Sequence, residues 1–243
     1  EVTVSLYELE ITVEVTVESF QPVGRSTLTF TGKGTDTDVQ GDWVYIAAGS
    51  GGVHLVDVSD KDNPFIESSY AAATGAIDVK VSGDHLYVAR GLKGIDILDV
   101  SDKANPTLLA NYPSSGSATE LAIDNGLLFI ANGAGGLEII DVSEPVTPIS
   151  VSVLDGMSTV LGVDAQGDRA VVVNSSSMIV IDISDPASPL RLGSINIGNL
   201  RAVVMNGDYA YVACYTCGYK VINISDPMSP QIVGSDSRFY PTD

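Results

Sequence analysis

Three acidic residues occur at the same place in successive segments of the chain and could together bind a cation. Asp36, Asp78 and Glu120 each precede a Gly-Asp or Asn-Gly dipeptide by five residues. Carboxylate oxygens suit Ca²⁺, so calcium is the one metal cofactor that the sequence suggests. The alternative is that each acid accepts a hydrogen bond from a neighbouring backbone N–H or stays solvated. We expect the alternative, and hence no cofactor, because a chain with 31 Asp and Glu residues places acids in many such columns.

Two cysteines, Cys214 and Cys217, form a Cys-Tyr-Thr-Cys motif. A zinc ribbon would need a second such pair or added histidines, and the chain has no further cysteine. A thioredoxin-type redox motif would need a helix N-terminus in a βαβ setting. The motif therefore predicts a local disulfide that staples a turn, with two free thiols as the alternative.

Other candidate residues give little support for catalysis, so we expect a protein that is not an enzyme. His54 and His85 take different positions in the repeating segments described below, and no Ser/His/Asp set accompanies them. The many acids offer pairs for a glycosidase, but nothing selects one pair. The segment Asp57–Pro64 superficially resembles a calcium loop, yet it lacks the Gly and the final Glu of an EF-hand. We expect a turn there.

Two tripeptides match the N-glycosylation sequon. Asn174-Ser175-Ser176 is expected in an exposed turn between strands, where Asn174 would be an accessible acceptor. Asn223-Ile224-Ser225 places Asn223 at a position where the other repeats have Asp, so a structural hydrogen bond is the stronger expectation for it.

A repeat of about 42 residues positions all of these groups. One landmark column recurs at intervals of 42, 42, 41 and 41 residues: Asp57, Asp99, Asp141, Asp182 and Asn223. A proline column recurs at the same intervals: Pro64, Pro106, Pro148, Pro189 and Pro230. Each repeat also contains a Gly-Asp or Asn-Gly dipeptide between two short alternating runs, which is typical of a tight hairpin turn.

Each repeat is expected to supply four antiparallel strands: the hairpin, the run before the landmark Asp, and a run after the proline. Four such strands in about 42 residues are typical of a β-propeller blade, and five blades lie within the number that closes a ring. The sequence therefore predicts an all-β propeller of five four-stranded blades. Both 27–31 and 231–235 read as a fourth strand, so either chain end could close the ring.

The run Ile179-Val180-Ile181-Asp182 and its four sister copies, each followed by a Ser-Asp or Ser-Glu turn, resemble the LVIVD repeat family. This resemblance covers about residues 35 to 240. It implies β-propeller repeats of a kind found mostly in surface or exported proteins of bacteria and archaea. It implies no catalytic residues.

The N-terminal segment, residues 1–20, has no counterpart in the repeats. Apolar and polar residues alternate from Tyr7 to Val17, and the phase is opposite before Tyr7. We expect one long strand with a bulge near Leu6-Tyr7. The apolar row of this interaction arm is Tyr7, Leu9, Ile11, Val13, Val15 and Val17. A lone strand must pair, either with its own chain or, by strand addition, with another copy. Residues 21–26 read as a linker, and 27–243 as the propeller.

Composition limits the class of partner. Twelve Lys and Arg against 31 Asp and Glu give a net charge of −19 and an isoelectric point near 4.1, which argues against nucleic acid and anionic membrane surfaces. The sequence contains no run of 18 apolar residues, so it does not predict membrane insertion. We expect an extracellular or cell-surface protein that forms a homo-oligomer, filament or surface layer through the N-terminal strand. The alternative is a glycan- or ligand-binding propeller of the lectin or adhesin kind.

Overall fold

The computed structural model describes residues 2–7, 10–15 and 28–236. Its described repeats form five antiparallel sheets of four strands, which confirms the predicted all-β class. Blade 1 contains β3 (Asp36–Gln40), β4 (Trp43–Ala47), β5 (Val53–Asp57) and β6 (Phe65–Tyr70). Blade 2 contains β7 (Asp78–Ser82), β8 (His85–Ala89), β9 (Ile95–Asp99) and β10 (Thr107–Tyr112). Blade 3 contains β11 (Glu120–Asp124), β12 (Leu127–Ala131), β13 (Leu137–Asp141) and β14 (Ile149–Leu154).

The last two blades have the same strand order. Blade 4 contains β15 (Val160–Gln166), β16 (Arg169–Asn174), β17 (Ser177–Asp182) and β18 (Leu190–Asn196). Blade 5 contains β19 (Leu200–Asn206), β20 (Tyr209–Cys214), β21 (Gly218–Asn223) and β22 (Gln231–Asp236). Within each blade the strands pair in sequence order, so every blade is built from one repeat.

The turn residues have the backbone conformations and hydrogen bonds that the sequence predicts. Gly41 has a φ of 62° and Asn125 has a φ of 49°, the left-handed region that a two-residue hairpin turn requires. The landmark Asp57 accepts a hydrogen bond from the Ser59 backbone N–H at 2.8 Å, and the other four landmark residues repeat this contact. Hydrogen bonds from the Ser59 side chain and backbone lower the pKa of Asp57. The Asp-Ser-Pro segment is thus a turn, as expected.

Apolar packing between neighbouring blades forms the core. We call the face of a blade on the side of the following repeat its forward face, and the face on the side of the preceding repeat its backward face. In the first seam, Tyr45 and Leu55 on the forward face of blade 1 pack with Val79 and Leu86 on the backward face of blade 2. Three further clusters repeat this arrangement between blades 2 and 3, 3 and 4, and 4 and 5.

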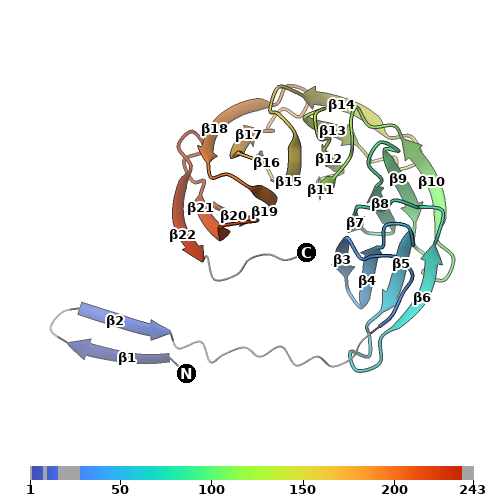
Figure 1. The fold of residues 1–243 in the computed structure, drawn as a ribbon, viewed down its shortest axis with the longest axis horizontal. Helices are drawn as coiled ribbons and strands as arrows, with labels where there is room; N and C mark the ends of the chain where they lie inside the picture. The colour runs from blue at the N-terminus through green and yellow to red at the C-terminus, as the bar shows by residue number, and fades with distance from the viewer. Residues whose placement is uncertain (1, 8–9, 16–27, 237–243) are drawn as a thin grey trace.

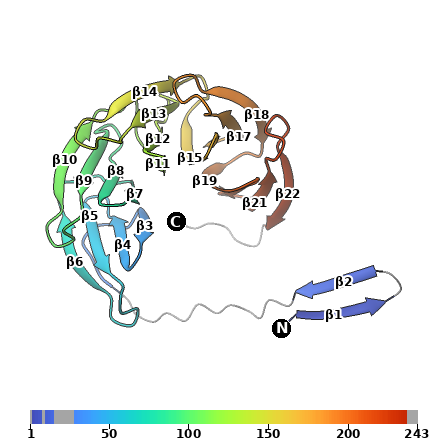
Figure 2. The ribbon, with the colours of Figure 1, turned by 180° about the vertical axis from the view of Figure 1, so that it is seen from behind.

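The five blades follow one another around a common centre, and their first strands, β3, β7, β11, β15 and β19, lie innermost (Figures 1 and 2). The arc is open between β22 and blade 1, where the two views agree. The expected ring closure is therefore not observed. β22 is the fourth strand of blade 5, as one alternative had it, whereas the described residues 28–31 form no strand. Because no strand is shared between the chain ends, the described blades do not join into a ring.

The N-terminal segment is a hairpin, so the single long strand predicted from Tyr7 to Val17 is wrong. β1 (Val2–Tyr7) pairs antiparallel with β2 (Glu10–Val15) in a two-stranded sheet of their own. The phase reversal at Leu6-Tyr7 falls where β1 ends, and no bulge interrupts the described pairing. A reversal of chain direction therefore accounts for the change of phase.

Candidate functional site

The three candidate metal ligands lie on the innermost strands, and their contacts are with backbone. Asp36 accepts a hydrogen bond from the Val79 N–H at 3.2 Å. Asp78 accepts one from the Leu121 N–H at 2.9 Å. Each acid thus binds the first strand of the following blade, which is the alternative that the sequence favoured. Among the described residues, no group of three or more His, Cys, Asp or Glu side chains has an arrangement suited to a metal ion.

Glu120 continues this series, binding the backbone of Val163 in blade 4. The fourth repeat has Gly162 where an acid would stand, and the structure gives the reason. A Cβ atom on Gly162 would lie 2.9 Å from the Glu120 Oε2 atom and 2.8 Å from the Val173 side chain. The row of acids therefore ends at blade 3, because the Glu120 side chain fills the space that a side chain at position 162 would need.

Lys80 lies among these acids and is coupled to them. Burial alone would lower the pKa of Lys80, but Asp78 and the other nearby carboxylates raise it overall. Burial raises the pKa of Asp78 well above its usual range, against the opposing effect of Lys80. Burial also raises the pKa of Glu120 to about 8, with Lys80 opposing and Asp36 and Asp164 adding to the shift. Near neutral pH the row therefore holds one cation and at least one protonated acid.

A cavity of about 480 Å³ opens beside this row. Its lining includes Asp36, Asp78, Lys80 and Glu120 from blades 1 to 3, and Arg201 from blade 5. The volume is large enough for a small polar molecule. The acids are already engaged by backbone N–H groups, however, so the groups left to contact such a molecule are few.

A second polar column, buried at the seams, escaped the sequence analysis. His54, Asp96 and Glu138 occupy equivalent positions in β5, β9 and β13, and each is only 2% exposed. The sequence aligns these three residues at one position of the repeat and predicts that they point outward from the third strand, so their burial is a correction. The signal in the sequence is a polar residue at the second position of each of these strands, with apolar residues on both sides of it.

Each member of this column ties a loop to the blade. His54 contacts the Ser69 hydroxyl at 2.7 Å and the Thr31 carbonyl oxygen at 2.9 Å through its two ring nitrogens. Asp96 forms a 2.6 Å ion pair with Arg90. The Glu138 carboxylate accepts hydrogen bonds from four groups: the Tyr112 hydroxyl, the Ser115 N–H, the Ser115 hydroxyl and the Asn132 side-chain amide. These contacts hold loops in place.

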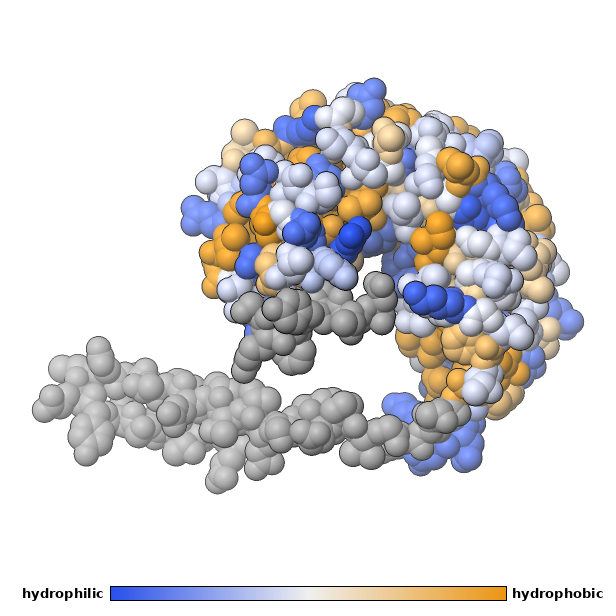
Figure 3. All heavy atoms as spheres, viewed as in Figure 1, coloured by the Kyte–Doolittle hydropathy of each residue, from blue (hydrophilic) through white to orange (hydrophobic). Residues whose placement is uncertain are grey.

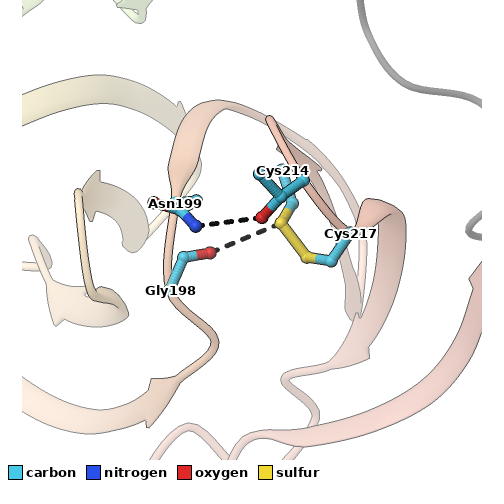
Figure 4. Close-up of a disulfide and its surroundings, with 5 residues drawn as sticks. Gly198, Asn199, Cys214 and Cys217 are labelled. Carbon is cyan, nitrogen blue, oxygen red and sulfur yellow. Dashed lines mark hydrogen bonds between the residues drawn. A yellow bond between two sulfur atoms is a disulfide. The ribbon is translucent and has the colours of Figure 1, made fainter.

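The predicted disulfide between Cys214 and Cys217 is confirmed, and Figure 4 shows it beside Gly198 and Asn199. The two Cα atoms are 5.2 Å apart, and the bond spans the connection from β20 to β21. The Asn199 side-chain amide donates a hydrogen bond of 2.9 Å to the Thr216 hydroxyl inside the bridged loop. The disulfide and this contact together fix the turn of blade 5 that the other blades form with glycine-rich or serine-rich loops.

The structure corrects the expected accessibility of Asn174. This residue is the last of β16 and is 7% exposed. Its side-chain amide donates a hydrogen bond of 2.7 Å to the Met157 carbonyl oxygen, and its side-chain oxygen accepts N–H groups from the following turn. The nitrogen that a glycan would need is therefore buried and engaged. Asn223 accepts hydrogen bonds from the Ser225 N–H and hydroxyl, the structural role expected for it.

The interaction-arm residues are divided by the hairpin. Tyr7 ends β1, whereas Ile11, Val13 and Val15 belong to β2. The predicted Leu9 and Val17 lie outside the described residues. The register pairs apolar with apolar residues: Val2 with Val15, Val4 with Val13 and Leu6 with Ile11.

The described residues contain no helix of the length and apolarity needed to span a lipid bilayer. No curated protein matches the sequence. Among solved structures, the chain resembles a functionally unknown protein from Desulfotomaculum acetoxidans, with a TM-score of 0.73 at 15% identity over 86% of this chain and 72% of that one. The computationally designed Ika8 protein matches with a TM-score of 0.66 at 13% identity over 85% of this chain and 62% of that one, so the chain spans less than two thirds of its length.

A chain of the mitotic checkpoint complex matches with a TM-score of 0.69 at 17% identity, over 92% of this chain and 74% of that one. PorZ, a bacterial surface component of the type-IX secretion system of Porphyromonas gingivalis, matches with a TM-score of 0.60 at 17% identity, over 85% of this chain and 26% of that one. At these identities the similarity is one of fold. The LVIVD repeat model matches five times, over residues 31–72, 74–113, 115–155, 160–196 and 197–236. The chain belongs to the LVIVD repeat family.

Proposed function

We propose that this protein is an extracellular structural or interaction protein that assembles with copies of itself through its N-terminal hairpin. The observation that carries the proposal is the isolation of β1 and β2 in a two-stranded sheet separate from the blades. A hairpin alone is at best marginally stable in water, and it gains stability when a further strand or sheet joins it. Its apolar-to-apolar register gives it one side suited to such a partner.

The blades offer acceptor edges. The fourth strand of each blade is the outermost and pairs with the third strand only, as seen in the order of every described sheet. All five outer strands also carry exposed apolar residues; Phe65, for example, is 50% exposed and Ile149 64% exposed. Strand addition to an edge of this kind supplies backbone hydrogen bonds and apolar contacts together. A net charge of −19 disfavours nonspecific association of copies, so the contact must be specific.

Two observations support an extracellular location. The Cys214–Cys217 disulfide would persist in an oxidising compartment and is unusual in the cytosol. PorZ, a similar fold, is described as a bacterial surface component.

The test compares full-length protein with variants of the hairpin by light scattering over a range of concentrations. Val4→Glu places a charge on the apolar row, whereas Ser5→Glu places the same charge on the adjacent row and is the matched control. We expect wild type and Ser5→Glu to assemble, and Val4→Glu to lose the association that depends on the hairpin, with an unchanged melting temperature of the blades. Monomeric wild-type protein at high concentration would refute the proposal.

A ligand-binding function is the second candidate, because the 480 Å³ cavity combines acids, Lys80 and Arg201. Calcium ions and a panel of soluble glycans would each be titrated while the melting temperature is followed. A rise that disappears in Lys80→Met would favour this candidate, and no rise with any ligand would remove it.

A further inference from the structure

One face at the end of the arc differs from its counterparts in the other blades. The residue four positions after the hairpin-turn glycine or asparagine lies on the forward face in every repeat. In blades 1 to 4 the next blade buries it, with exposed fractions of 0%, 3%, 1% and 0% for Tyr45, Tyr87, Phe129 and Val171. In blade 5 the same position is Tyr211, which is 42% exposed. Blade 5 therefore has the residue that packs between blades elsewhere, but no described blade packs against it.

The rest of this forward face is also apolar and exposed. Val204 is 60% exposed, Tyr209 42% and Tyr219 44%. The register places Val204 directly opposite Tyr211, which in turn lies opposite Val221. We call this surface, formed by Val204, Tyr209, Tyr211, Tyr219 and Val221, the blade 5 end face.

The other end of the arc shows the matching half of a seam. Val39, on the backward face of blade 1, is 58% exposed. Its equivalents in blades 4 and 5, Ala165 and Met205, are each 9% exposed because the preceding blade covers them. Val44 and Ile46 complete this blade 1 end face and are half-buried. Orange, apolar surface lies over both ends of the arc in Figure 3.

Polar groups at the two ends match as well. In three of the four seams, the residue before the turn accepts a hydrogen bond from the N–H of the turn glycine in the next blade, a contact that we call a clasp. Gln40 accepts a hydrogen bond from the Gly83 N–H at 3.0 Å, and Gln166 accepts one from the Gly207 N–H at 2.9 Å. Asn206 occupies this clasp position in blade 5, and Gly41 occupies the turn position in blade 1. Each end therefore carries one half of a clasp that three of the internal seams complete.

We infer that the blade 5 end face binds the blade 1 end face of a second copy of this chain. The argument is complementarity: the two exposed faces are the two halves of a seam that the chain already forms four times. The contact is heterologous, so each copy keeps one free end and further copies can add. It uses residues that the hairpin proposal does not involve and stands independently of it.

The test uses the full chain and two charge substitutions, Tyr211→Glu and Val39→Glu. Both side chains are about half exposed, so each variant should fold, with a melting temperature close to that of wild type under monomeric conditions. A charge placed in an apolar seam should weaken self-association by roughly 100-fold or more in Kd. Leu92→Glu, at a site 88% exposed away from both end faces, is the control and should associate as wild type does.

Mixing the two variants gives the deciding measurement. Tyr211→Glu keeps an intact blade 1 end face, and Val39→Glu keeps an intact blade 5 end face. With Val4→Glu added to both variants to remove the hairpin contact, a mixture should therefore form a one-to-one heterodimer and stop there, as measured by light scattering, whereas each variant alone stays monomeric. If the mixture stays monomeric while wild type associates, or if the two faces meet within one molecule, the inference is overturned.

The outcome also separates this contact from that of the hairpin. Association that survives Tyr211→Glu and Val39→Glu but is lost in Val4→Glu would leave the hairpin proposal standing and refute the end-face contact. Association lost in the end-face variants and retained in Val4→Glu would do the reverse.

Discussion

Phe129 and Tyr211 occupy the same position in two blades, and truncating each to alanine measures what a neighbouring blade contributes. Phe129 is 1% exposed between blades 3 and 4, where it packs with Val163 and Val172 among others. Phe129→Ala should lower the free energy of unfolding by about 3–5 kcal/mol, because it removes buried apolar surface and leaves a cavity. Tyr211 is 42% exposed. Tyr211→Ala should cost roughly 1–1.5 kcal/mol, since less area is lost and solvent can fill the space.

The assay is urea unfolding at a concentration where the protein is monomeric. Far-ultraviolet circular dichroism follows all blades, while the fluorescence of Trp43, the only tryptophan, reports blade 1. Equal losses for the two variants would show that position in the repeat, rather than coverage by a neighbour, determines the contribution, and would refute the reasoning. A loss for Phe129→Ala seen by dichroism but not by fluorescence would show that blade 1 unfolds separately from that seam.

Three further outcomes follow from individual contacts. Glu138→Ala should lower the free energy of unfolding in urea by about 2–4 kcal/mol, because it leaves buried donors from Ser115 and Asn132 unpaired. The control is Lys220→Ala, at the equivalent position in blade 5, which should cost less than about 0.5 kcal/mol. The pKa of Glu120 is raised to about 8, so the folded state binds more protons than the unfolded state and stability should fall as pH rises from about 4.5 through 8; this slope should be smaller in Glu120→Gln, and an unchanged slope would contradict the assignment. Replacing Cys214 and Cys217 by serine should cost about 2 kcal/mol, the value for a very short loop; a reductant should lower the melting temperature of wild type and leave the double variant unchanged.

The blades could be predicted because their signals are local. Each turn glycine, each landmark Asp and each proline acts within a few residues, and five copies in register make the pattern unambiguous. The hairpin could not be predicted so readily, because the alternation of apolar and polar residues continues from Tyr7 to Val17 with no Gly, Pro, Asn or Asp to indicate a turn. The phase reversal at Tyr7 was the only local sign of it.

Burial of a polar residue by a segment outside its own repeat is the second feature that could not be predicted from the sequence. Asn174 is a polar residue at the end of a strand, and nothing within its own repeat shows that another segment covers it. Asn174 is buried because Met157, in the loop that precedes β15, lies over it and accepts its amide. The seam pairs one repeat with the next, so a column alignment identifies equivalent residues without showing which surface they meet.

Because each blade consists of one unbroken repeat, no strand among the described residues ties the first blade to the last. Its cooperativity must then arise from contacts between adjacent units alone, as in a linear array. An internal blade is held from both sides and a terminal blade from one, so opening should begin at the ends and reach blade 3 last. The same feature allows the number of units to change by duplication or loss of a single repeat, because no closing register has to be preserved.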